Sequence, residues 1–225
     1  FALAVELAKK NDVDFILGTD QDSDRVGIMI RDKAGAYQVV TGNQTGVVLL
    51  DYLLGAMQRS GKLPEKPVAL KTIVTTEMAR AVAEHYGAAC YDTFTGFKFL
   101  AEKKDKLESS GEGKVVFSYE ESYGYMLGDF VRDKDAVTAS LALTEMAAYY
   151  AAKGMTVLDA LNALYEQYGY YGEKTHNLVM PGLVGLKDMA RLIASLRQAP
   201  PKEIAGVTVK QFKDYQDGSV LDCAS

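Results

Sequence analysis

Hydrophobic residues follow two periodicities along this chain, one typical of strands and the other of helices. Short apolar runs rich in Val and Ile predict strands, whereas apolar positions three or four residues apart predict helices. Val48, Leu49 and Leu53, for example, share one face of a helix that we expect to end before Gly61. The predicted strands cover residues 13–17, 26–30, 68–74, 89–91 and 114–118, and the predicted helices cover 42–59, 77–86, 135–153 and 156–168, with another helix opening at 95–98.

Strand and helix alternate with short turns between them, which is the pattern of an α/β fold. We expect one complete domain over residues 41–172, with a mixed sheet flanked by helices on both faces. The composition changes near residues 172–175, and a helix over residues 187–197 and a strand at 207–209 follow. We therefore predict partial neighbouring domains at both ends, over residues 1–40 and 173–225.

The first residues already have a helical pattern, without an initiator Met or a capping residue. We therefore expect the chain to be a piece of a longer protein.

The composition is that of an ordinary globular protein, with 48% hydrophobic and 24% charged residues. A net charge of −5 argues against nucleic acid as the main partner. No apolar run reaches the ~18 residues of a membrane span and no signal peptide is visible, so we expect no membrane partner. Cys90 and Cys223 form no disulfide or metal motif, which favours the reducing cytoplasm.

The most informative polar stretch lies between the first two predicted strands, at residues 18–25. Asp20, Asp22 and Asp24 occupy alternate positions there, and their charges would repel one another without a cation among them. Oxygen ligands of this kind suit Mg2+. Arg25 follows directly and adds a planar donor group of the kind that binds phosphate. The stretch therefore predicts a divalent metal and a phosphoryl group bound together.

Three other interpretations compete with a metal site for this stretch. A solvated acidic turn, in which each Asp bonds its own backbone, is common. An EF-hand is excluded, because Arg25 and Arg31 occupy the loop positions that need Gly and Glu. A phosphatase of the haloacid dehalogenase type, with Asp20 as nucleophile, stays open. Asp24 is a poor substitute for that family's small β-branched residue, although residues 128–133 resemble its later Gly-Asp-x-x-x-Asp motif.

Polar residues also fall where three later elements end or begin, the usual position of ligands in open α/β sheets. Lys71 interrupts an apolar strand, and a buried lysine is rare unless it is paired or faces an anion. Residues 95–98, Thr-Gly-Phe-Lys, open a helix whose free N–H groups suit phosphate, although simple capping by Thr95 explains part of this pattern. Glu120 and Ser122 offer acceptors for vicinal sugar hydroxyls, and the alternative is an exposed acidic loop.

Taken in order, these stretches resemble the α-D-phosphohexomutase superfamily, and within it the bacterial phosphoglucomutases that can also accept phosphomannose. The stretches are Thr-Asp-x-Asp-x-Asp-Arg, Lys-Thr, Thr-Gly-Phe-Lys, Glu-Glu-Ser and Asp-Lys-Asp, and residues 42–46 and 132–135 extend the likeness. Members of the family have four domains. The resemblance implies that residues 1–40 end the second domain with the metal loop, 41–172 form the third with the sugar-binding loop, and 173–225 are a linker and the start of the fourth.

The resemblance also implies roles for single residues. The Mg2+ ligands would be Asp20, Asp22 and Asp24. The catalytic candidates are Arg25, which matches an arginine beside the phosphoryl group, and Lys71. The substrate-binding candidates are Thr95, Gly96, Lys98, Glu120, Ser122 and Lys134.

The implied reaction moves phosphate between C1 and C6 of a hexose, through hexose 1,6-bisphosphate and a phosphoserine of the enzyme. Neither the family's Ser-His-Asn phosphoserine loop nor its Arg-x-Ser-Gly-Thr phosphate loop occurs in this chain, so we expect these residues alone to be inactive. A non-catalytic module that binds metal or sugar phosphate is the remaining alternative. The residues leave open the preference among glucose, mannose and pentose phosphates, and the oligomeric state.

Overall fold

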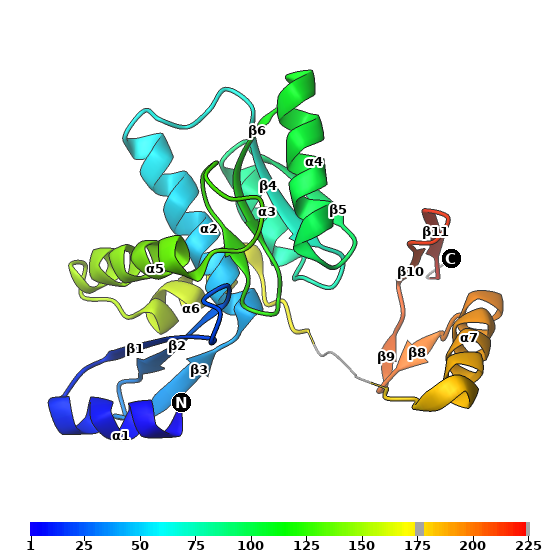
Figure 1. The fold of residues 1–225 in the computed structure, drawn as a ribbon, viewed down its shortest axis with the longest axis horizontal. Coiled ribbons are helices and arrows are strands. Elements are labelled where there is room, and N and C mark those ends of the chain that lie inside the picture. The colour runs from blue at the N-terminus through cyan, green and yellow to red at the C-terminus, as the bar shows by residue number, and fades with distance from the viewer. Residues whose placement is uncertain (174–177, 224–225) are drawn as a thin grey trace. The chain divides into compact units, whose positions relative to one another are not determined.

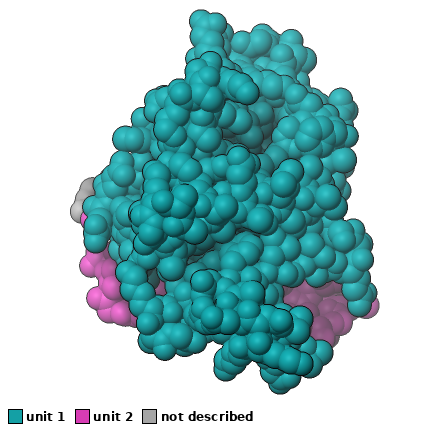
Figure 2. Space-filling model, turned by 90° about the vertical axis from the view of Figure 1, so that its left-hand side faces the viewer, with its two compact units in different colours: residues 1–173 teal, residues 174–225 magenta. Residues whose placement is uncertain are grey.

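The computed structural model describes residues 1–173 and 178–223. The chain divides into two compact units, residues 1–173 and 174–225, which Figure 2 colours separately. In the second unit, α7 (Gly182–Gln198) precedes two short hairpins, β8 (Glu203–Ile204) with β9 (Val207–Thr208) and β10 (Gln211–Asp214) with β11 (Ser219–Asp222). Across the described residues, no helix is both long and apolar enough to span a membrane.

The first unit begins with a three-stranded antiparallel sheet in the order β1-β2-β3, formed by β1 (Phe15–Thr19), β2 (Val26–Arg31) and β3 (Tyr37–Val40). Successive side chains of a strand point to opposite faces. Met29 therefore packs under α1 (Ala2–Asn11) with Ala8, whereas Ile28 and Ile30 join the large core that continues into the following helices. The large core therefore packs β2, and with it the β1–β2 turn, against the rest of the unit.

The central sheet of the first unit has the strand order β5-β4-β6-β7. Its strands are β4 (Pro67–Thr72), β5 (Ala89–Thr93) and β6 (Lys114–Tyr119), which run parallel, and β7 (Tyr125–Met126), which is antiparallel to β6. β4 lies in the middle and is buried along its whole length, as its apolar sequence predicts.

Helices cover both faces of this sheet (Figure 1). Val68 and Leu70 of β4 pack against α4 (Phe97–Ser110) in one core. Ala69, which points the other way, belongs to the core formed with α2 (Gly42–Arg59), α3 (Met78–His85), α5 (Ala136–Ala151) and α6 (Val157–Tyr168). The expected α/β fold with a mixed sheet flanked by helices is confirmed.

The boundary that we predicted near Thr41 falls inside the first compact unit. Thr41 caps α2, and its side chain accepts the N–H of Gln44. Core residues from both sides of Thr41, such as Ile28 and Leu49, belong to one cluster. The assignment of residues 1–40 to a separate domain of a longer protein stays a prediction.

Candidate active site

The three aspartates predicted as metal ligands lie together in the β1–β2 turn, which we call the metal loop (residues 20–25). One carboxylate oxygen from each of Asp20, Asp22 and Asp24 lies within 4.8 Å of the other two. Asp20 Oδ1 accepts the backbone N–H of Asp24 at 3.1 Å and that of Arg25 at 3.0 Å. The N–H of Arg25 is the main cause of a lowered pKa of Asp20, so this carboxylate stays ionised at neutral pH.

Two cationic side chains face Asp24. Lys134 Nζ lies 2.6 Å from Asp24 Oδ2, and Arg25 Nη1 lies 4.0 Å from Asp24 Oδ1 and 3.9 Å from Asp20 Oδ2. Burial lowers the pKa of Lys134, but its bonds to Asp24 and Asp133 outweigh burial and leave that pKa raised. The ammonium is therefore charged and fixes one side of the metal loop.

The environment of Asp24 Oδ1 shows whether these residues suit a metal ion. Within residues 1–173 and 178–223, this buried oxygen has no hydrogen-bond partner. A buried carboxylate oxygen without a donor needs an explanation, and a bound cation supplies one. The donor set of three carboxylates is the kind that Mg2+ prefers. The residues therefore fit a magnesium ion.

The segment between β6 and β7, residues 120–124, carries the residues predicted to bind sugar, and we call it the sugar loop. Glu120 is buried, and its Oε1 accepts the N–H of Gly96 at 2.8 Å. Ser122 Oγ donates to the other oxygen, Glu120 Oε2, at 3.4 Å. The structure thus brings together Gly96, Glu120 and Ser122, three of the substrate-binding residues predicted from the sequence.

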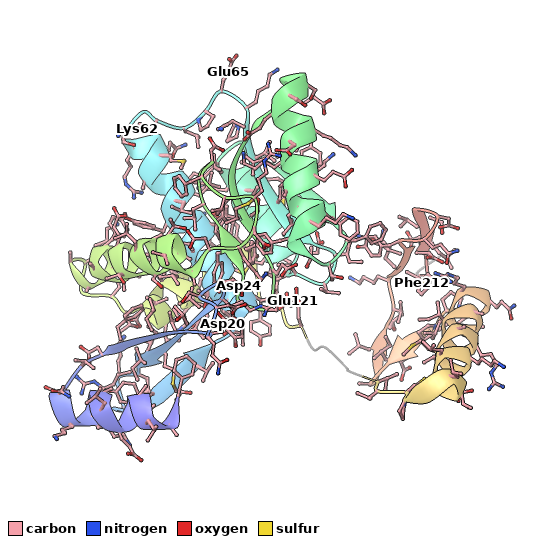
Figure 3. All side chains as sticks on the ribbon, viewed as in Figure 1. Asp20, Asp24, Lys62, Glu65, Glu121 and Phe212 are labelled. Atoms are coloured by element: carbon pink, nitrogen blue, oxygen red, sulfur yellow. The ribbon has the colours of Figure 1, made fainter. Side chains whose placement is uncertain are left out.

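Backbone contacts join the metal loop to the sugar loop. Residues Arg25 and Gly124 form an isolated antiparallel bridge, and the N–H of Val26 donates to the carbonyl of Tyr123 at 3.1 Å. Lys134 also touches both loops, because its Cδ lies 2.9 Å from the position that a Cβ would take on Gly124. Figure 3 labels Asp20, Asp24 and Glu121 in this region. The two candidate loops therefore form one continuous site.

Thr95 and Lys98 are both exposed at the start of α4. Gly96, between them, has a φ of 108°, which favours glycine, and this conformation lets its N–H meet Glu120. The side chains of Thr95 and Lys98 are thus open to solvent beside the sugar loop. Their part in substrate binding stays a prediction.

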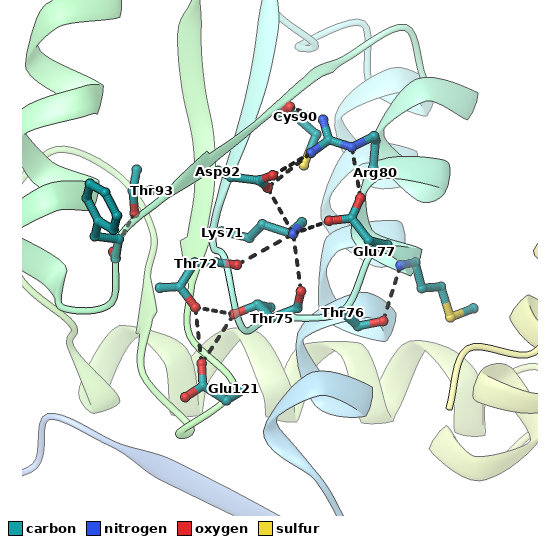
Figure 4. Close-up of polar contacts among 12 residues, drawn as sticks. Lys71, Thr72, Thr75, Thr76, Glu77, Arg80, Cys90, Asp92, Thr93 and Glu121 are labelled. Atoms are coloured by element: carbon teal, nitrogen blue, oxygen red, sulfur yellow. Dashed lines mark hydrogen bonds and ion pairs between the residues drawn. The ribbon is translucent and has the colours of Figure 1, made fainter. Parts of the chain in front are cut away.

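Lys71 has a different environment from the one that we expected of a catalytic residue. Its side chain is fully buried, and Nζ lies 2.8 Å from Glu77 Oε1, 2.9 Å from Asp92 Oδ1 and 3.1 Å from the carbonyl oxygen of Thr75 (Figure 4). Burial lowers its pKa, but the bonds to Glu77 and Asp92 raise the pKa above its ordinary value. All three ammonium protons have internal acceptors. These contacts support a positioning role, and direct catalysis by Lys71 stays a prediction.

Sequence reasoning missed two acidic partners of Lys71, Glu77 and Asp92, and it included Glu121 in the Glu-Glu-Ser stretch without giving it a role of its own. One signal was present for the first two, because a lysine in an apolar strand needs acidic partners. Asp92 stands directly opposite Lys71 in the β4–β5 register, so aligning the two strands would have found it. Glu121 carries no such signal, because its partners depend on how a distant turn folds.

Asp129, which the phosphatase interpretation would need near Asp20, lies elsewhere. Its carboxylate pairs with Lys104 and Lys114, each at 2.6 Å. Lys114 begins β6, at the opposite end of that strand from Glu120. These contacts give the phosphatase interpretation no support.

Comparisons with known proteins give the family of the chain. Residues 41–168 match the family model described as phosphoglucomutase/phosphomannomutase, alpha/beta/alpha domain III. The phosphoglucomutase of Staphylococcus aureus (strain MSSA476) is 34% identical over 220 residues, which are 98% of this chain and 39% of that protein. The chain thus spans about two fifths of the length of this relative.

Solved structures show the same fold. The Paramecium phosphoglucomutase pp63/parafusin, in its open form, has a TM-score of 0.63 and 22% identity, with 97% of this chain and 37% of that chain covered. The Aspergillus fumigatus N-acetylphosphoglucosamine mutase, in complex with GlcNAc-6P and magnesium, has a TM-score of 0.51 and 14% identity, with 76% and 38% covered. Because the family model covers more than half of the chain, the chain belongs to the phosphoglucomutase/phosphomannomutase family.

Proposed function

We propose that these residues form the metal-binding and sugar-recognising part of a phosphoglucomutase or phosphomannomutase, which moves phosphate between C1 and C6 of a hexose. The observation that carries the proposal is the joining of the metal loop to the sugar loop, through the Lys134–Asp24 ion pair and the bond from Val26 to Tyr123. A 34% identical relative is a phosphoglucomutase, which supports the same reaction here.

In this proposal, Asp20, Asp22 and Asp24 hold Mg2+, the metal named with the Aspergillus fumigatus relative. When bound, the ion supplies positive charge to the phosphoryl oxygens during transfer. Arg25 is 47% exposed, so its guanidinium is free to turn from the carboxylates toward a phosphoryl oxygen. Lys134 neutralises part of the acidic cluster and keeps Asp24 in place.

Sugar recognition falls to Glu120 and Ser122. One carboxylate oxygen of Glu120 is fixed by Gly96, and the remaining lone pairs of the group can accept sugar hydroxyls. Thr95 and Lys98, with the free N–H groups at the start of α4, would bind the phosphate at the far end of the sugar. Sugar and phosphate would then be held from adjacent segments.

Phosphoryl migration also needs a group that carries phosphate between the two positions. No Ser-His-Asn loop occurs among these 225 residues, so we propose that a longer protein supplies the phosphoserine and that hexose 1,6-bisphosphate is the intermediate. We further propose that this protein works in the cytoplasm, which both unpaired cysteines, Cys90 and Cys223, favour.

Glu120→Gln in the full-length protein tests the role of the sugar loop. The amide oxygen can still accept the N–H of Gly96, but the charge that strengthens bonds from sugar hydroxyls is lost. We expect kcat/KM to fall by about 10- to 100-fold, with KM raised. Steady-state assays with glucose 1-phosphate and mannose 1-phosphate measure this, and Glu112→Gln, an exposed site beyond α4, is the matched control. A KM for Glu120→Gln equal to that of the control would speak against the assignment.

A further inference from the structure

Glu121 lies between the two sugar-loop residues but faces a different part of the molecule. Glu120 and Ser122 direct their side chains to each other, whereas Glu121 Oε2 contacts the hydroxyl groups of Thr72 at 3.1 Å and Thr75 at 3.3 Å. Thr72 is the last residue of β4 and Thr75 lies in the turn that follows, and we call residues 72–77 the β4 turn. Figure 4 shows the carboxylate of Glu121 below the two hydroxyl groups.

The contacts around Glu121 share a limited number of protons. Thr72 Oγ1 and Thr75 Oγ1 also lie 2.7 Å from each other, so three contacts are served by two hydroxyl protons. Each hydroxyl donates once. One threonine therefore donates to Glu121 while the other donates to Glu121 or to its neighbour. The half-buried carboxylate is the terminal acceptor for the two buried hydroxyls, and both hydroxyls depend on it.

The β4 turn is also held by Lys71. The ammonium donates to the carbonyl of Thr75, and Lys71 is anchored by Glu77 and Asp92. From the side, Asn43 of α2 accepts the N–H of Thr76 at 3.1 Å. The turn is therefore a rigid base, and Glu121 is the side chain that attaches the sugar loop to it.

The backbone of Glu121 is fixed as closely as its side chain. A Cβ on Gly42 would lie only 2.0 Å from the Glu121 carbonyl oxygen, so the first turn of α2 touches the sugar loop directly. Tyr123 adopts a φ of 68°, a conformation that a non-glycine residue keeps only when its surroundings fix it. The loop thus has one defined shape, and the contacts at Glu121 attach it to α2 and to the β4 turn.

We propose that Glu121 is a positioning residue for sugar recognition, which aligns Glu120 and Ser122 by attaching the sugar loop to the Lys71-supported β4 turn. This inference rests on the proposed function, because it assigns the purpose of the alignment to hexose phosphate binding. Glu121 does not touch the sugar itself. Its effect is transmitted through the two side chains that do.

Kinetics of the full-length protein test this positioning role. In Glu121→Ala, KM for glucose 1-phosphate should rise about tenfold, because the loop loses its attachment, while the Mg2+ concentration for half-maximal activity stays within about twofold. Glu121→Gln should return KM to within about threefold of wild type, because its amide oxygen still accepts a threonine hydroxyl. A role in folding alone would lower the active fraction and leave KM unchanged.

A double-mutant cycle identifies the threonine partners. Thr72→Val with Thr75→Val keeps the shape of both side chains and removes both hydroxyls, so it should raise KM about as much as Glu121→Ala. Because all three side chains act as one unit, adding Glu121→Ala should raise KM by less than about twofold more. The proposal would be overturned if the KM increases of the threonine variant and of Glu121→Ala multiplied fully when combined. A KM within twofold of wild type for Glu121→Ala would overturn it as well.

Failure of the proposed function gives a different result. A full-length wild-type protein that isomerises none of the hexose phosphates refutes the mutase activity itself. Amide hydrogen exchange of the full-length protein then decides the positioning role. Faster exchange over residues 120–124 in Glu121→Ala than in Glu112→Ala supports the attachment, and equal exchange in the two variants overturns it.

Discussion

Asp22→Asn in the full-length protein is expected to lower kcat about a thousandfold while KM for hexose phosphate stays within about twofold. Asp22 is exposed, and its carboxylate gathers with those of Asp20 and Asp24. The amide keeps the shape of the side chain but removes one negative charge from the metal site. The loss falls on kcat because the ion acts on charge that builds up in the transition state.

Steady-state assays over a range of Mg2+ concentrations measure this effect. Asp32→Asn is the matched control, because Asp32 Oδ1 accepts the N–H groups of Ala34 and Ala36 in an exposed turn, and an amide oxygen can do the same. The control should retain full activity. A kcat for Asp22→Asn within fivefold of wild type would count against the metal assignment.

Lys71→Met should lower the free energy of unfolding by about 3 kcal/mol, because it removes the fully buried ammonium that pairs with the partly exposed carboxylates of Glu77 and Asp92. Glu77 and Asp92 lose their shortest contacts, at 2.8 and 2.9 Å. Arg80 remains 3.0 Å from each of these carboxylates and compensates part of the loss, which places the expected value at the low end for a buried pair.

Urea unfolding of the 225-residue chain, followed by circular dichroism because the chain has no Trp, measures this loss. Lys106→Met is the control, because Lys106 is 70% exposed and pairs with Glu102 on the surface of α4. Such a surface pair contributes about 0.5 kcal/mol or less. If the two lysine variants lose equal stability, the buried ion group is not what holds the β4 turn.

The elements of the fold followed well from local sequence patterns. The alternating aspartates predicted a loop whose three carboxylates do gather, because a turn between paired strands leaves few other arrangements. The helix over residues 42–59 was predicted at its observed limits. Thr41 caps its first turn, and Gly61 adopts a positive φ just after its last turn. Local signals of this kind act over a few residues and need no knowledge of the tertiary structure.

The contacts that join these elements could not be predicted in the same way. Asp24 pairs with Lys134, which lies 110 positions later in the sequence, and Thr72 bonds to Glu121, which lies 49 positions later. Such pairs depend on how β6, β7 and α5 pack, and no local pattern encodes them. Lys71 shows the consequence, because its residue type suggested an anionic ligand, whereas the folded chain supplies Glu77 and Asp92 as partners.

We infer that the metal loop and the sugar loop serve a Mg2+-dependent phosphohexomutase. The most direct measurement is conversion of glucose 1-phosphate to glucose 6-phosphate by the full-length protein, primed with hexose bisphosphate, before and after removal of divalent metal. We expect conversion with Mg2+, its loss on chelation and its return when Mg2+ is added back, with no conversion by residues 1–225 alone. No conversion by the full-length protein with Mg2+ present, or a rate unchanged after metal removal, would contradict the claim.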